Sequence, residues 1–231
     1  DLGQSPADLV VLSFSDSDLG AFAEAWHRGG GKQGKLPTLR LANLVALKHP
    51  LSVDTYVEQT LEGAQGILIR LIGGVPYWAY GLQQVKALAD RKGLALAVLP
   101  ADGRVDERLD AFSTLPVSTL RRLQHLCDTG GAVAAQAALA QMALAAGLYA
   151  GPVRGSKVLP MVGAWSEVHG VCCPAVACFD DDFGGSAPAP AVHPQGISKP
   201  TKPRLLVTFY RSYLVAADLA RDDGFHPPRA P

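Results

Sequence analysis

The sequence has few cysteines and no excess of charge of either sign. Its four cysteines are Cys127, Cys172, Cys173 and Cys178. They are too few and too clustered for a disulfide framework in a chain of 231 residues, so we expect a reducing, cytoplasmic location. Lysine and arginine together number 21, as do aspartate and glutamate. This balance argues against a nucleic-acid or anionic-membrane binder, because both depend on a basic surface.

Long apolar runs and a targeting segment are also missing. The most apolar window, residues 131–147, is rich in alanine and interrupted by Gln136 and Gln141. It therefore lacks the roughly 20 strongly apolar residues of a membrane span and predicts a helix in a soluble protein. The first six residues contain no basic region followed by an apolar one, so we expect no secretory signal.

Short apolar runs alternate with helical periodicity between residues 9 and 99, which is typical of a parallel sheet covered by crossover helices. The expected strands are 9–14, 39–44, 67–72 and 94–99. The expected helices include 19–26, 53–61 and 78–89, the last ending at Gly93. Ser15 and Asp18 have capping-box spacing before the first helix. Residues 1–114 therefore predict an α/β domain with a small, doubly wound parallel sheet of Rossmann or flavodoxin type.

Helical periodicity resumes after residue 114. Stripes over 117–127 and 132–146, separated by Gly130-Gly131, predict a helical hairpin within 115–150 that packs on or beside the sheet. Residues 151–203 shift to Gly, Pro, Ala and Ser without a sustained period, and predict a long connection. Residues 204–210 resemble a strand. With only about twenty residues after it, we interpret 204–231 as the start of an incomplete second α/β domain with an irregular tail.

Two motifs suggest a phosphate or a metal site but fit poorly. Residues 29–35 nearly match a P-loop, yet Leu36 lacks the hydroxyl, and the segment follows a helix and precedes a strand, the reverse of the required order. We interpret it as a surface loop. The weak metal candidates are His169, Cys172, Cys173 and Cys178. Because adjacent cysteines rarely converge on one ion and no Cys-x-x-Cys pair occurs, we predict no metal site.

Arg70 stands in an otherwise apolar strand and is followed by Gly73-Gly74. A guanidinium is costly to desolvate unless it is paired, and the glycines fall at the carboxyl end of the strand, where ligands bind in open α/β sheets. One interpretation pairs Arg70 with a carboxylate such as Asp16 and assigns the glycines to a tight turn.

The other interpretation makes the same place a binding crevice. In it, Arg70 and the Tyr77-Trp78 pair face an anionic ligand or a partner domain, with Gly73 and Gly74 lining the crevice. No nucleophile elbow, His-Glu-x-x-His or Gly-x-Gly-x-x-Gly after a strand is present in the sequence. We therefore predict no catalytic residue.

Several segments together resemble a known family. They are Arg-Leu-Ile-Gly-Gly-Val-Pro-Tyr-Trp-Ala-Tyr-Gly-Leu at 70–82, Leu-Ala-Val-Leu-Pro at 96–100, Leu-Arg-Arg-Leu at 120–123, Gly-Leu-Tyr at 147–149 and Phe-Tyr-Arg-Ser at 209–212. They resemble the amino-terminal region of the large subunit of the aerobic cobaltochelatase, a family related to the porphyrin-binding subunit of magnesium chelatase. The resemblance extends over about residues 9–219.

The resemblance implies ATP-dependent insertion of Co(II) into a corrin, hydrogenobyrinic acid a,c-diamide, in aerobic cobalamin biosynthesis. In that family the large subunit binds ring and metal, while an AAA-type ATPase subunit and a second small subunit supply the ATP-driven step with Mg. The family's chain is several times longer. The resemblance therefore implies a truncated chain, inactive alone, that binds no cofactor itself and docks against a missing carboxyl-terminal body.

Two alternatives stay open beside this interpretation. One is a stand-alone α/β module that binds a small anionic ligand at the crevice of Arg70 and Gly73-Gly74. The other is a degenerate fragment without activity. The family pattern leads us to expect a helix over residues 221–228, but their glycine and two prolines disfavour one. This favours a truncated or interrupted chain.

Overall fold

A parallel sheet forms the centre of the described structure. The computed structural model describes residues 2–149, 164–166 and 170–172. The strands of the sheet are β1 (Leu9–Ser13), β2 (Leu39–Asn43), β3 (Gly66–Leu71) and β4 (Ala95–Pro100). They are hydrogen-bonded in the order β2-β1-β3-β4, and all three pairings are parallel. The predicted doubly wound α/β fold is confirmed.

The strands form where the sequence is continuously apolar. All residues of β1, β3 and β4 are buried, as expected for strands covered on both faces, whereas β2 is half-exposed at one edge. The other edge strand, β4, is protected along its outer side. There Leu96 donates its N–H to the Thr114 hydroxyl at 2.8 Å, and Val98 donates to the Ser113 hydroxyl at 2.9 Å. These bonds satisfy donors that an edge strand otherwise leaves unpaired.

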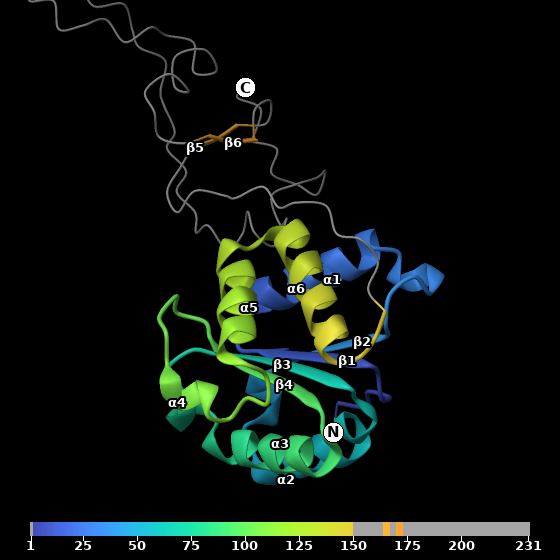
Figure 1. Ribbon diagram of the computed structural model, residues 1–231, viewed down its shortest axis with the longest axis vertical. Coiled ribbons are helices and arrows are strands. Elements are labelled where there is room, and N and C mark those ends of the chain that lie inside the picture. The colour runs from blue at the N-terminus through green and yellow to red at the C-terminus, as the bar shows by residue number, and fades with distance from the viewer. Residues whose placement is uncertain (1, 150–163, 167–169, 173–231) are drawn as a thin grey trace, which may run out of the picture. The chain divides into compact units, whose positions relative to one another are not determined.

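Helices cover both faces of the sheet (Figure 1). One face carries α2 (Pro50–Gln59) and α3 (Ala79–Lys92), and the other carries α1 (Asp16–Arg28), α5 (Val117–Thr129) and α6 (Gly131–Ala145). Alternate strand residues divide between the two cores, with Val10 in the first and Val11 in the second. The shorter elements are η1 (Gly31–Gln33), η2 (Leu44–Leu47), η3 (Leu61–Gly63), η4 (Val75–Tyr77) and α4 (Glu107–Asp110).

The predicted helical hairpin is α5 and α6, and it lies on the sheet. Leu120, Leu123 and Ala138 share a hydrophobic core with Leu9 and Val11 of β1. Helix α6 packs against both α1 and α5, and its small alanine side chains let these helices lie close to it. None of the helices in the described residues is long and apolar enough to cross a membrane.

The chain divides into two compact units, and each is described separately. Residues 2–149 belong to the first. The second includes β5 (Ala164–Ser166) and β6 (Gly170–Cys172), which pair antiparallel. No strand was expected there, because each of these strands is only three residues long and lies in a Gly- and Pro-rich region. The rest of the predicted connection, and the predicted strand at 204–210, lie outside the described residues.

Candidate functional site

The strand order places a switch point between β1 and β3. From β1 the chain passes through α1 to β2, toward one edge of the sheet. From β3 it passes through α3 to β4, toward the other edge, and α1 and α3 cover opposite faces of the sheet. In open α/β sheets the ligand crevice lies at the carboxyl ends of such strands. Arg70 is opposite Ser13, the last residue of β1. The residue that the sequence singled out therefore lies at the switch point.

Arg70 is held by two carboxylates from opposite ends of two helices. Its Nη1 donates to Oδ1 of Asp18 at 2.9 Å, and its Nη2 donates to Oδ1 of Asp128 at 2.7 Å. Asp18 lies in the first turn of α1, and Asp128 in the last turn of α5. Only 4% of Arg70 is exposed. The guanidinium therefore ties β3 to both helices, and we call Arg70, Asp18 and Asp128 the arginine triad.

The predicted pairing of Arg70 with a carboxylate is confirmed, but Asp16 as the partner is wrong. Oδ1 of Asp16 accepts a hydrogen bond from Nδ2 of Asn43 at 2.6 Å, at the end of the edge strand β2. Asp18 lies two residues further into the helix, and its Oδ2 also accepts from the Ser13 hydroxyl at 3.0 Å. This bond holds the Asp18 carboxylate beside the end of β1, within reach of Arg70.

Burial shapes the ionisation of the groups around Arg70. Burial raises the pKa of the Asp128 carboxyl, and the positive charge of Arg70 offsets only part of that rise. Burial likewise raises the pKa of the Cys127 thiol to about 12, so this thiol is protonated at neutral pH and is a poor nucleophile. With both carboxylates ionised, the triad carries two negative charges against one positive. Each of the two terminal nitrogens of Arg70 already donates a hydrogen bond to one of these carboxylates.

The two glycines after β3 shape the exposed rim of this site. Gly73 and Gly74 have φ angles of 82° and 75°. A Cβ at residue 73 would lie 2.2 Å from Cε2 of Tyr77, so the absence of a side chain there lets the tyrosine ring pack on the backbone. Tyr77 is 66% exposed, and Ile72 is 46% exposed. The glycine turn therefore presents an aromatic and an aliphatic side chain to solvent.

The Tyr77-Trp78 pair does not face one direction, contrary to the crevice interpretation. Trp78 is buried in the core beneath η4, and its Nε1 donates to the carbonyl oxygen of Leu47 at 2.8 Å. Trp78 therefore joins η4 to η2 as a core residue, while Tyr77 is exposed. The sequence did not distinguish them, because an aromatic residue in a helical stripe fits both a core and a binding face.

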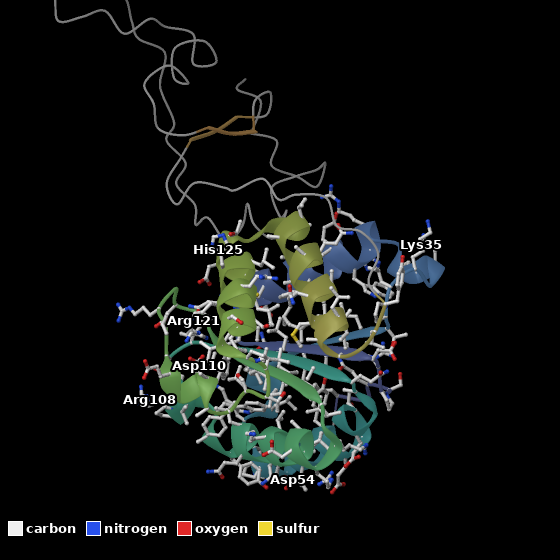
Figure 2. All side chains as sticks on the ribbon, in the orientation of Figure 1. Lys35, Asp54, Arg108, Asp110, Arg121 and His125 are labelled. Carbon is white, nitrogen blue, oxygen red and sulfur yellow. The ribbon has the colours of Figure 1, made fainter. Side chains whose placement is uncertain are left out.

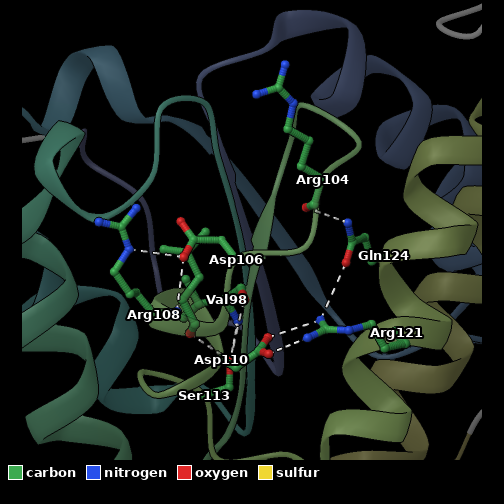
Figure 3. A network of polar contacts seen from close by, with 9 residues as sticks. Val98, Arg104, Asp106, Arg108, Asp110, Ser113, Arg121 and Gln124 are labelled. Carbon is green, nitrogen blue, oxygen red and sulfur yellow. Dashed lines mark hydrogen bonds and ion pairs between the residues drawn. The ribbon is translucent and has the colours of Figure 1, made fainter.

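A polar network fixes the connection between β4 and α5 (Figure 3). Arg121 on α5 forms an ion pair with Asp110 at the end of α4. Nε2 of Gln124 donates to the carbonyl oxygen of Arg104 at 2.9 Å. Ser113 accepts from the N–H of Val98, which attaches the same connection to β4. These contacts hold the loop in place at the rim of the carboxyl edge, beside the glycine turn.

The other candidates from the sequence lie elsewhere. Residues 29–35 lie between α1 and β2 around η1, so the predicted reversal of the P-loop order is confirmed, and Figure 2 shows Lys35 at the periphery of its unit. Cys172 lies in β6, and His169, Cys173 and Cys178 lie outside the described residues. In the part of the chain that the structure describes, no group of three or more His, Cys, Asp or Glu residues could hold a metal ion.

The sheet order defines a small flavodoxin-like α/β domain, with Arg70 paired at its switch point and an exposed rim at its carboxyl edge. No family model matches the sequence. The chain is 35% identical over 219 residues to the aerobic cobaltochelatase subunit CobN of Pseudomonas aeruginosa. These residues make up 95% of this chain and 16% of that protein. It is 42% identical over 131 residues to CobN of a Sinorhizobium species. That alignment covers 57% of this chain and 10% of that protein.

The resemblance inferred from the sequence is thereby confirmed: the chain is related to a segment of the aerobic cobaltochelatase large subunit, CobN. It spans about one sixth of the length of the Pseudomonas relative and one tenth of the other. Among solved structures, the catalytic subunit of cobaltochelatase from Mycobacterium tuberculosis matches with a TM-score of 0.48 and 23% identity, over 65% of this chain and 12% of that chain.

Proposed function

We propose that this chain is the amino-terminal portion of the corrin-binding large subunit of an ATP-dependent cobaltochelatase. That enzyme inserts Co(II) into hydrogenobyrinic acid a,c-diamide in aerobic cobalamin biosynthesis. It works in the cytoplasm with an AAA-type ATPase subunit and a second small subunit. The chain itself acts as a head domain that docks against the carboxyl-terminal body of the large subunit and holds no catalytic residue.

The observation that carries this proposal is the 35% identity with the Pseudomonas subunit over 95% of the chain. The aligned length of 219 residues exceeds that of the described α/β domain, residues 2–149. A common fold alone does not require sequence similarity over this length, whereas descent from a common ancestral subunit accounts for it. The cobalt and the corrin are substrates of the complete enzyme in this proposal.

The pairing of Arg70 at the switch point supports a positioning role. Inserting a metal into a tetrapyrrole requires a base that removes ring N–H protons and a cavity that excludes water. Here the carboxylates of Asp18 and Asp128 are bonded to Arg70, and the nearby Cys127 thiol is protonated. These groups stabilise the domain, and we assign none of them to the removal of a ring proton. The triad therefore fixes the relative positions of β3, α1 and α5.

The exposed rim supplies the docking surface in this proposal. Ile72, Tyr77 and Val105 are 46%, 66% and 59% exposed, and we call them the docking rim. Val105 precedes Asp106, whose carboxylate lies beside Gly74. Because the Tyr77 ring already packs on Gly73, it loses little conformational freedom on binding, and rigid aromatic side chains of this kind often dominate binding energy.

The ATP-driven step is assigned to the partner subunits. The glycine- and lysine-containing loop around η1 follows a helix and precedes a strand, so it does not have the strand-loop-helix geometry that cradles phosphates. We therefore assign no nucleotide contact to this loop. The anionic-ligand module is the alternative. It would require an anion to bind the remaining N–H groups of Arg70 beside the two carboxylates.

Two binding measurements test the proposal on the full chain. Calorimetry with hydrogenobyrinic acid a,c-diamide and with inorganic phosphate is expected to give no saturable binding by the chain alone. A Pseudomonas CobN variant that lacks its matching segment is expected to bind the chain. Tyr77→Ala should weaken that complex by about tenfold or more. Tyr149→Ala, a control at a 78% exposed tyrosine outside the rim, should leave it unchanged.

The two results separate the alternatives. Saturable phosphate binding without any binding to the CobN body would contradict the proposal and favour the anionic-ligand module. Binding to the body that is weakened equally by both tyrosine variants would retain the head domain and reject the docking rim as its contact surface.

A further inference from the structure

A water-sized cavity lies beside Arg70. Its volume is about 10 Å³, and residues of α1, β3, α5 and α6 line it. The residues that matter here are Asp18, Arg70, Gly130, Gly131 and Ala135. A space of this size holds about one water molecule, provided that polar partners surround it. None of the docking-rim residues lines this cavity, and its occupancy is independent of the proposed function.

Two of the elements that line this cavity, β3 with Arg70 and the start of α6, carry hydrogen-bond donors without an acceptor in the described part of the protein. Among the described residues, Nε of Arg70 is the buried side-chain nitrogen or oxygen atom that has no hydrogen-bond partner. Only 5% of the Arg70 side chain is exposed. The first residue of α6, Gly131, also lines the cavity, and no side chain caps this end of the helix. The N–H groups of a first helical turn have no acceptor within the helix. A molecule that binds here would therefore have to be a hydrogen-bond acceptor.

The charges nearby decide which acceptor fits. Arg70 contributes one positive charge, whereas Asp18 and Asp128 contribute two negative ones when ionised. An anion would add a further negative charge beside two carboxylates, and this repulsion is strong in a partly buried site. A neutral acceptor avoids it. Asp18 also offers oxygen lone pairs to a molecule that can donate in return.

We propose that a single water molecule occupies this cavity, accepts hydrogen bonds from Arg70 Nε and the first turn of α6, and donates to Asp18. It completes the hydrogen bonding of the guanidinium, and it links β3 to the Gly130-Gly131 corner between α5 and α6. The water is then a structural member of the switch point, because its removal would leave a buried guanidinium donor unpaired.

The direct test is nuclear magnetic resonance of the full chain with isotope-labelled arginine. The Nε–H proton of Arg70 is expected to show a cross-relaxation peak to a bound water. Its resonance should be unchanged by chloride or bromide titration at constant ionic strength. Absence of the water peak, or a saturable halide-dependent shift that identifies a bound anion, would overturn the proposal.

A cavity-filling variant gives a second test. Ala135→Val places two methyl groups at the lining of the cavity, and Ala140→Val on the same helix controls for the lower helix propensity of valine. If water is present, Ala135→Val should raise the unfolding equilibrium constant about fivefold or more beyond the control, because the Arg70 donor loses its partner. Stability equal to or greater than that of the control would overturn the proposal.

Discussion

Nη1 of Arg70 lies 2.9 Å from Oδ1 of Asp18, although 52 residues separate the two in the sequence. The contact joins the end of β3 to the start of α1 across the switch point of the sheet. Both side chains are largely buried, with 5% and 17% of their surfaces exposed. A pair of this kind owes its importance to the charges that would be left uncompensated without it.

Removing the positive charge of the triad should be severe. Arg70→Met leaves Asp18 and Asp128 facing each other without a cation, and we expect it to lower the free energy of unfolding by about 3–5 kcal/mol. The triple variant that adds Asp18→Asn and Asp128→Asn removes the unpaired charges and should recover much of this loss. Urea unfolding measures both. A triple variant as unstable as Arg70→Met alone would show that packing, rather than charge, sets the effect.

Asp128 should make stability depend on pH in a definite direction. Because burial raises its pKa above the ordinary 3.8, the folded protein holds this proton to higher pH than the unfolded chain does. Stability from this group is therefore greatest at low pH and falls as the pH rises through its folded pKa. Asp128→Asn removes this dependence and keeps an acceptor for Arg70.

The comparison of wild type with Asp128→Asn by urea unfolding between about pH 3 and pH 7 tests that sign. The free energy of unfolding of the wild type, relative to the variant, should fall with rising pH. A relative stability that rises with pH would mean that the attraction of Arg70 outweighs desolvation, and would contradict the prediction.

Gly73 should tolerate a side chain less well than another glycine of similar backbone conformation. Alanine at a positive φ costs about 1–2 kcal/mol at either Gly73 (φ 82°) or Gly93 (φ 69°). Only at Gly73 does the new Cβ also meet a neighbour, the ring of Tyr77, because no atom lies within 4 Å at Gly93. We expect thermal unfolding to show a larger loss for Gly73→Ala than for Gly93→Ala.

Adding Tyr77→Ala isolates the steric part of that loss. The double variant Gly73→Ala with Tyr77→Ala should be destabilised, relative to Tyr77→Ala, by about as much as Gly93→Ala destabilises the wild type. If the excess persists without the tyrosine ring, contact between residue 73 and Tyr77 is not its cause.

Ser15 should contribute to stability as the amino-terminal cap of α1. Its hydroxyl accepts a hydrogen bond from the N–H of Asp18 at 3.3 Å. We expect Ser15→Ala to lower the free energy of unfolding by about 1 kcal/mol. Ser17→Ala, in the same helical turn, should change it by less than about 0.5 kcal/mol. Equal effects of the two substitutions in urea unfolding would contradict the capping role.

The sheet was predictable because its cause is local. Buried parallel strands are continuous apolar runs, and the observed strands agree with the predicted ones to within one residue at each end. The helix that ends at Gly93 was predictable for the same reason, because a left-handed glycine cap is encoded in a few adjacent residues.

The partners of Arg70 were not predictable in the same way. The sequence assigned Asp18 to a capping box, and its N–H does bond to Ser15, but its carboxylate bonds to Ser13 and Arg70 instead. Asp128 is 58 residues from Arg70. It reaches the site because the chain returns along β4, where Thr114 donates its N–H to the carbonyl of Leu96, before α5 begins. No local pattern encodes that return path.

Cobalt insertion by a chimaera tests the central claim most directly. In it, this chain replaces the matching segment of the Pseudomonas subunit, and the proposed partner subunits, ATP, Co(II) and hydrogenobyrinic acid a,c-diamide are supplied. We predict that the chimaera inserts cobalt, whereas the 231-residue chain alone does not. A chimaera that folds and binds its partners without inserting cobalt, or an isolated chain that inserts it unaided, would contradict the account.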